Sequence, residues 1–145
     1  MTNMISVKYF FVGRTCVGGS PRFQLAIDTD GDRIANGNAF GYLGEQDFGG
    51  GCPADRWVHQ DMANLASTAG NWDLSQFGGP FSATWAEVIA FFAEQTTQVL
   101  ACGLFDDSGS FAEGARGIAY YDNVQCHDRA LEDHQDVRPG TNAPF

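Results

Sequence analysis

A strict alternation of apolar and polar side chains limits what this chain can fold into. In residues 22–27, RFQLAI, the side chains of Phe23, Leu25 and Ile27 point to one side of an extended backbone and the others to the opposite side. Such a period of two indicates a β-strand with one buried face. A polar loop rich in Asp and Gly follows, and then a second apolar run, NAFGYLG at 38–44. We therefore expect the two runs to pair as an antiparallel hairpin.

The rest of the chain is also richer in strand patterns than in helix patterns. The 145 residues include 18 glycines, and 43% of the residues are hydrophobic, which is enough for one domain with a sizeable core. Short strands joined by glycine turns fit this composition better than a helical bundle. The further strand candidates are residues 5–12, 55–62, 71–77, 98–107 and 116–126. The sequence thus predicts an all-β protein.

One helix interrupts the strands. Thr84 and Glu87 form a T-x-x-E capping box, the pattern that begins many helices. An apolar stripe at helical spacing follows, made of Trp85, Val88, Ile89 and Phe92. We expect a helix over about 84–94 whose stripe faces the core and which covers one end or one face of the sheets.

The charge of the chain excludes some partners. The net charge of −10 and the single lysine, Lys8, disfavour nucleic acids and anionic membranes, because phosphate groups attract positive surfaces. An acidic surface suits divalent cations, although it also serves solubility. The apolar stretches fall well short of the ~20 residues of a membrane-spanning helix. No basic region or cleavage pattern of a signal peptide is seen, so secretion would require a signal that is absent from this sequence.

The four cysteines predict disulfide bonds. Their number is even, their spacing is wide and no C-x-x-C pair is present, which disfavours a zinc site. Of the possible pairings we expect Cys16–Cys52, which encloses the acidic loop, and Cys102–Cys126, which ties the last two strand candidates together. Four buried free thiols are the alternative. Disulfides would place the protein outside the cell.

The loop between the first two strands predicts a calcium site. Asp28, Asp30 and Asp32 occupy positions 1, 3 and 5 of a D-x-D-G-D pattern, and Asn36 occupies position 9. A curved loop can direct alternate carboxylates at one point, and calcium takes about six to eight oxygen ligands. The backbone carbonyl of Ile34 is a further expected ligand. The alternative is a polar hairpin whose Asp and Asn side chains only bind backbone amides.

This loop departs from an EF-hand at two positions. Arg33 stands where an EF-hand has glycine, and Ala39 stands where it has a bidentate glutamate. Ligands from elsewhere in the chain are then needed. We expect Asp122 to supply one, because it alternates with apolar residues and needs a partner. Asp106 and Asp107 are a second candidate pair, although an ordinary turn explains them equally well.

Three stretches carry a resemblance to a known kind of domain: GGSPRFQLAIDTDGD, NWDLSQFGGPFSATWAEVIAFF and DDSG…YYDNV. Across residues 13–125 they resemble a little-characterised secreted microbial β-sandwich domain. The closing YDNV is also similar to the last strand of jelly-roll carbohydrate-binding modules, where the aspartate commonly helps to bind a structural calcium. The resemblance implies a jelly-roll-like antiparallel sandwich over 1–126. An acidic tail, 127–145, would then dock on the domain or on a neighbouring subunit.

Catalysis is the least favoured function class. The sequence has no G-x-S-x-G, H-E-x-x-H or Cys/His nucleophile pattern. A glycosidase is the one enzyme class left open, because it needs only a pair of carboxylates and the chain has many. We therefore expect a protein that is not an enzyme.

A structural subunit that assembles outside the cell is the first expectation for function. The apolar strand 5–12 has no evident partner in the sequence, and unpaired strand edges invite pairing with a neighbouring chain. This strand, the tail at 127–145, or both would then contact other subunits in a filament or an adhesive layer.

The alternative is a carbohydrate-binding module, in which exposed aromatic rings stack on sugar faces. The candidates are Trp57, Trp72, Tyr42 and Tyr121, of which we expect Trp72 and Tyr121 to form the platform. Tyr121 is singled out because it is opposite in phase to Tyr120. Most large rings belong in the core of a chain with 12 Phe, however.

Overall fold

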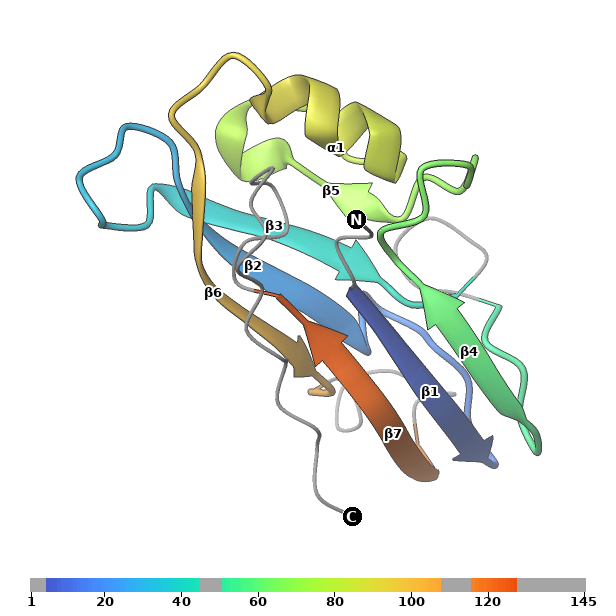
Figure 1. Cartoon of the computed structure of the whole chain (residues 1–145). Helices are drawn as coiled ribbons and strands as arrows, with labels where there is room; N and C mark the ends of the chain where they lie inside the picture. Colours follow the sequence, from blue (N-terminus) through green and yellow to red (C-terminus); the bar gives the residue numbers. More distant parts are fainter. Residues whose placement is uncertain (1–4, 45–50, 108–115, 128–145) are drawn as a thin grey trace.

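The computed structural model describes residues 5–44, 51–107 and 116–127 of the chain. These residues form a sandwich of two antiparallel β-sheets with one α-helix, α1 (Trp85–Phe92), at one end (Figure 1). The prediction of an all-β sandwich with one short helix is therefore confirmed. The strands are, in chain order, β1 (Ile5–Val12), β2 (Arg22–Asp28), β3 (Gly37–Tyr42), β4 (Trp57–Asp61), β5 (Trp72–Asp73), β6 (Gln98–Phe105) and β7 (Ile118–Cys126).

One sheet has three strands in the order β4-β1-β7. The side chains of β1 alternate between the core and the outer face of the sheet, and the buried ones are Ile5, Val7, Tyr9 and Phe11. β7 is interrupted by a β-bulge, where its pairing with β1 shifts between Ser6 and Lys8. Asn123, with a left-handed φ of 47°, lies at this bulge.

The position of β1 corrects one expectation. The strand over residues 5–12 is not without a partner, because it pairs with β4 on one side and with β7 on the other. β7 lies near the opposite end of the described sequence, so no local pattern reveals this pairing. The tail that was expected to contact a neighbouring subunit lies outside the described residues from 128 onward.

The other sheet has four strands in the order β5-β3-β2-β6. β2 and β3 form the predicted hairpin, and Phe23, Leu25 and Ile27 of β2 are fully buried. The short strand β5 brings Trp72 against Gly41 of β3. A Cβ atom at Gly41 would lie 2.9 Å from the Trp72 ring, so the glycine makes room for this core indole.

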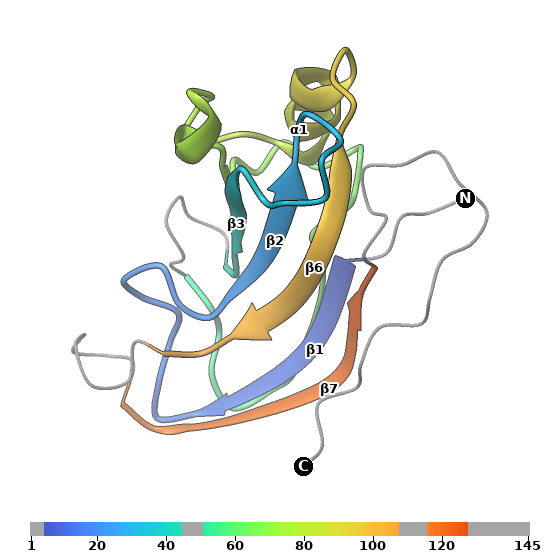
Figure 2. The same ribbon diagram turned by 90° about the vertical axis from the view of Figure 1, so that its left-hand side faces the viewer.

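The helix α1 begins as predicted. The Thr84 side chain accepts a hydrogen bond from the Glu87 N–H, and the Glu87 carboxylate accepts one from the Thr84 N–H, so both halves of the capping box are present. Trp85, Val88 and Phe92 are buried. α1 lies across the end of the sandwich that also carries the β2–β3 loop (Figures 1 and 2).

Both predicted disulfides are formed. Cys16 is bonded to Cys52, and Cys102 to Cys126. The second bond joins β6 and β7, the edge strands of the two sheets, and so fastens the sandwich along one side (Figure 2). Closing a loop of this length stabilises a fold by about 3 kcal/mol. Two such bonds are typical of a protein that works in an oxidising environment.

Within the described residues, no helix has the length and apolar character that crossing a bilayer requires.

Candidate functional site

The β2–β3 loop brings the three predicted carboxylates together. One oxygen each of Asp28, Asp30 and Asp32 lies within 4.8 Å of the others. Asp28 is fully buried at the end of β2, whereas Asp30 and Asp32 are exposed. Arg33 adopts a left-handed φ of 68°, so the backbone keeps the conformation that glycine supplies at this position of an EF-hand.

Most of these oxygens already bind the loop itself. The Asp28 carboxylate accepts hydrogen bonds from the N–H groups of Asp30 (2.9 Å), Gly31 (2.7 Å) and Arg33 (2.8 Å). Burial alone would raise the pKa of Asp28, but these hydrogen bonds outweigh it and hold the pKa below its ordinary value. Asp30 and Asp32 each accept one further backbone N–H. The alternative interpretation, a hairpin whose carboxylates bind backbone amides, therefore accounts for these contacts without an ion.

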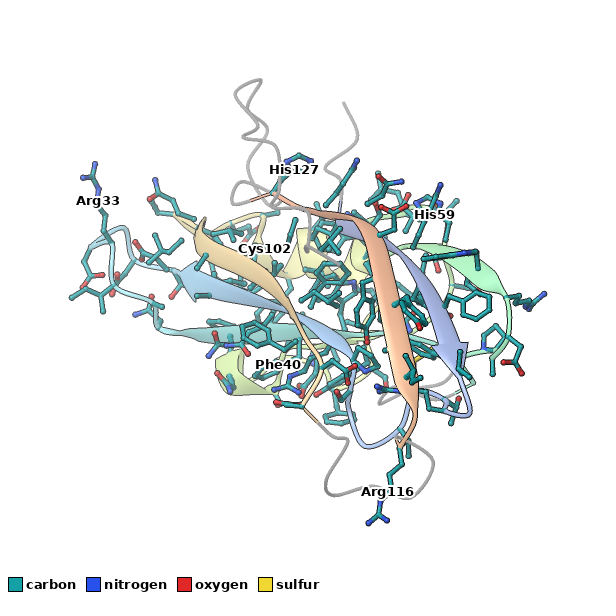
Figure 3. The ribbon with its side chains drawn as sticks, turned by 90° about the horizontal axis from the view of Figure 1, so that it is seen from below. Arg33, Phe40, His59, Cys102, Arg116 and His127 are labelled. Atoms are coloured by element: carbon teal, nitrogen blue, oxygen red, sulfur yellow. A yellow bond between two sulfur atoms is a disulfide. The ribbon has the colours of Figure 1, made fainter. Side chains whose placement is uncertain are left out.

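Of the other predicted calcium ligands, Asn36 contacts the cluster through its amide nitrogen, which donates to the Asp30 carboxylate at 3.4 Å. The Oδ1 atom of Asn36 accepts hydrogen bonds from the N–H (2.6 Å) and hydroxyl (3.0 Å) of Thr29, which fastens the two ends of the loop. Asp122 lies on β7 in the other sheet, exposed and opposite Lys8. Figure 3 shows Arg33 of the loop pointing away from β7. Asp122 therefore does not complete this site.

Asp106 and Asp107, the second candidate pair of calcium ligands, are instead bound by arginines. Asp106 receives two hydrogen bonds from Arg14, at 2.8 and 2.9 Å. Asp107 receives two from Arg22, at 2.7 and 2.9 Å. Such bidentate pairs satisfy both carboxylate oxygens.

Trp72 and Tyr121 do not form the predicted sugar platform, because Trp72 is buried and Tyr121 is half-buried against the core. Trp72 is 1% exposed and donates its indole N–H to the carbonyl of Met62 at 3.0 Å. Tyr121 packs edge-on against Phe11 and donates its hydroxyl to Asp106 at 2.7 Å. Burial and the Asp106 carboxylate raise the pKa of Tyr121.

Tyr42, a further aromatic candidate, is only 5% exposed and donates its hydroxyl to Asp73 at 3.1 Å. Its ring is therefore part of the packed structure. Of the candidates named from the sequence, only Trp57 is open to solvent, with 54% of its surface exposed.

Trp57 belongs to a group of three neighbouring rings on the outer face of the three-stranded sheet; two other exposed rings, Phe81 and Phe105, lie elsewhere. Trp57 of β4, Phe10 of β1 and Tyr120 of β7 occupy directly opposite positions, and we call them the aromatic row. The Phe10 ring centroid lies 5.7 Å from that of Trp57 and 6.4 Å from that of Tyr120. Tyr120 is 45% exposed. Three strands thus present three adjacent rings to water.

The rows on either side complete this face. Val12 and Ile118, a directly opposite pair, extend the apolar surface by one row. The row on the other side is polar and consists of His59, Lys8 and Asp122; Figure 3 shows His59 on β4. Among the described residues, no ion pair or side-chain hydrogen bond joins the members of this polar row to one another. One Asp122 oxygen accepts the N–H of Asn123 at 2.8 Å, and the other polar groups of the row lie open to solvent.

The bulge in β7 explains why the sequence pointed to the wrong tyrosine. In an unbroken strand, Tyr120 and Asp122 would share a face with Val124, which is buried. The extra residue at Asn123 reverses the phase, so that Tyr120 and Asp122 face outward and Tyr121 faces inward. The adjacent Asp-Asn pair is the only local hint, because Asn adopts left-handed φ values more readily than most residues.

Known proteins provide no further guide to this face. The chain finds no match among protein-family models, curated proteins or solved structures.

Proposed function

We propose that this protein is a carbohydrate-binding domain and that the aromatic row stacks on the rings of a glycan chain. The observation that carries the proposal is the alignment of three rings, from three neighbouring strands, on a face that leaves them in contact with water. A sugar ring has an apolar face of C–H groups and an edge of hydroxyl groups. The aromatic row suits the first, and the adjacent polar row suits the second.

The size of the exposed apolar surface favours a narrow ligand over a second protein. Two rows on three strands span roughly 10 Å across the strands and 7 Å along them. A stable protein–protein interface buries about 800 Å² on each partner, which is a far larger area. A single glycan chain laid across the strands has dimensions that match.

The tilt of the rings favours a separate chain over a crystalline surface. The Phe10 ring is inclined by 59° to Trp57 and by 67° to Tyr120. A flat crystalline polysaccharide requires coplanar rings, whereas successive sugars of a chain in solution can each turn toward a differently inclined ring. The net charge of −10 further favours a neutral glycan over a polyuronate, because like charges repel.

This proposal places sugar binding ahead of the structural subunit that was the first expectation. The apolar strand that motivated self-assembly is paired on both sides, and the tail lies outside the described residues. We retain the proposal that the protein works outside the cell, since its two disulfides are typical of oxidising compartments. We also retain the proposal that it is not an enzyme.

The test is binding to a panel of soluble and insoluble polysaccharides. We expect retention on soluble xylan or hydroxyethyl cellulose, and little on polyuronates. Trp57→Ala should weaken binding at least tenfold, since stacked rings dominate such interfaces. Phe81→Ala is the matched control, because Phe81 is 47% exposed but packs against Tyr42 of the other sheet. Retention of no polysaccharide, or equal loss in both variants, would refute the proposal.

The calcium ion predicted from the sequence is a second, separate proposal. The cluster of Asp28, Asp30 and Asp32 supports it, while their bonds to backbone amides argue for the simpler hairpin. A bound ion would raise the unfolding free energy by about 2.7 kcal/mol at a hundredfold excess over its dissociation constant. Melting curves with calcium and with a chelator decide between the two. Asp32→Asn should abolish any difference, and equal midpoints in the unaltered protein would exclude the site.

A further inference from the structure

A hollow lies beside the aromatic row, at the edge of the sheet formed by β4. Its volume is about 300 Å³, and we call it the β4 hollow. The polar side chains that line it come from β4 and from the segments before and after that strand: Arg56, His59, Asp61, Ser67 and Asn71. The lining also includes apolar groups, among them Tyr9, Pro53 and Val58, so polar and apolar surface meet in the hollow.

The β4 hollow and the proposed glycan face share one residue. His59 belongs both to the polar row and to the lining of the hollow. Arg56 and Val58, the chain neighbours of Trp57, line it as well. The row from Tyr120 past Phe10 to Trp57 thus ends on β4, the strand that contributes more residues to the lining of the hollow than any other strand.

Asn71 gives the hollow a fixed hydrogen-bond acceptor. Asn71 is only 7% exposed, and its amide nitrogen donates to the carbonyls of Tyr42 and Gly44, both at 2.9 Å. These two bonds fix the orientation of the side-chain amide. They leave its carbonyl oxygen without a hydrogen bond from the described residues. Such a preoriented group is what ligand recognition requires.

Two more side chains offer complementary groups. The Ser67 hydroxyl oxygen accepts the N–H of Ala69 at 3.2 Å, which leaves its hydrogen to be donated. One oxygen of Asp61 accepts the N–H of Ala63 at 3.0 Å, which leaves the other as an acceptor. A sugar ring carries several hydroxyl groups, and each of them can both donate and accept a hydrogen bond. Such a ring therefore matches the donors and acceptors that line the hollow.

We propose that the β4 hollow holds the terminal sugar unit of the chain that the aromatic row binds, so that the protein recognises chain ends. This inference rests on the proposed function. A volume of about 300 Å³ is at the small end of ligand pockets, which suits one sugar ring and not a longer segment. The segments before and after β4 contribute Pro53 and Ser67 to the lining of the hollow.

Titration calorimetry with chains of different length tests the inference. The probes are xylo- and cello-oligosaccharides together with soluble xylan and hydroxyethyl cellulose. Recognition of ends predicts one bound protein per chain, whatever the chain length. Several proteins bound along each long chain would overturn the inference and leave the proposed function intact. Absence of binding to every probe would overturn both.

Variants locate the terminal sugar. Ser67→Ala should weaken binding of short oligosaccharides roughly fivefold, the effect of one lost hydrogen bond. Leu65→Ala is the control, because Leu65 is 65% exposed, comes from the same segment and does not line the hollow. Unchanged affinity in Ser67→Ala together with His59→Ala would show that the hollow takes no part, even if Trp57→Ala abolishes binding.

Discussion

The outer faces of the two sheets carry aromatic and polar residues of the same kinds, but the two faces use them differently. On the four-stranded sheet, the Arg22 guanidinium lies 5.6 Å above the Phe40 ring and is held there by Asp107. The amide of Gln24 donates to Asn38 at 3.0 Å. The polar groups on this face thus bind one another, and Arg22 covers the Phe40 ring, although Phe105 of β6 stays 45% exposed.

The outer face of the three-stranded sheet lacks this internal pairing. Phe10 packs in a tilted arrangement against Trp57 and in an edge-to-face arrangement against Tyr120. The hydroxyl of Tyr120 makes no hydrogen bond to any described residue. Hydrogen bonds between the polar groups of one face contribute to the stability of the fold. Exposed rings and polar groups on the other face can instead contact a ligand. Substitutions on the first should therefore change stability, and substitutions on the second should change binding.

The largest expected effect is the dependence of stability on alkaline pH through Tyr42. Burial, followed by the charge and hydrogen bond of Asp73, raises the pKa of Tyr42 to about 12. The unfolded chain loses this proton near pH ~10. The stabilising effect of the neutral hydroxyl is complete below that pH and is lost as pH rises to about 12, by about 2 kcal/mol. Chemical denaturation should show a steeper decline for the unaltered protein than for Tyr42→Phe; parallel curves would contradict this account.

The neighbouring tyrosines of β7 provide a smaller and sharper comparison. Tyr121→Phe removes a donor to Asp106 and should lower the unfolding free energy by about 1.5 kcal/mol. Tyr120→Phe should leave stability unchanged, because that hydroxyl has no partner among the described residues. Urea denaturation of the two variants measures the difference. A larger loss in Tyr120→Phe would mean that the assigned phase of β7 is reversed.

The smallest effect is expected at acid pH from Asp107. The hydrogen bonds of Arg22 hold the pKa of Asp107 below its ordinary value, although burial opposes this. The stabilising pair is therefore complete above pH ~4 and is lost as the carboxylate gains a proton at lower pH. Because 58% of the Asp107 side chain is exposed, the loss should stay below about 1 kcal/mol. In Asp107→Asn, the free energy of unfolding should fall less at acid pH than in the unaltered protein, by this amount. An equal fall in both proteins would show that the pair contributes nothing.

The fold could be predicted from sequence wherever the signal is local. The alternation of RFQLAI, the capping box at Thr84 and the even number of cysteines led to the correct strand, helix and disulfides. The partners of β1 could not be predicted, because they lie far along the chain in both directions. A long-range pairing leaves no mark on a short pattern.

The candidate site was predicted less well for the same physical reason. Trp57 was named from the sequence, but Phe10 and Tyr120 become its neighbours only through the order and register of three strands. The single extra residue at Asn123 decides which tyrosine faces the solvent. The β4 hollow could not be foreseen either, since its lining comes from both sides of β4 and from Asn71.

The most direct test of the central claim is a map of backbone amide chemical shifts during titration with a soluble neutral oligosaccharide. We predict that the shifts change at the outward-facing positions of β4, β1 and β7, with the largest changes around Trp57, Phe10 and Tyr120. The amides of Arg22, Gln24 and Phe40 on the other sheet should remain unchanged. Shifts centred on those three residues, with the aromatic row unaffected, would contradict the account.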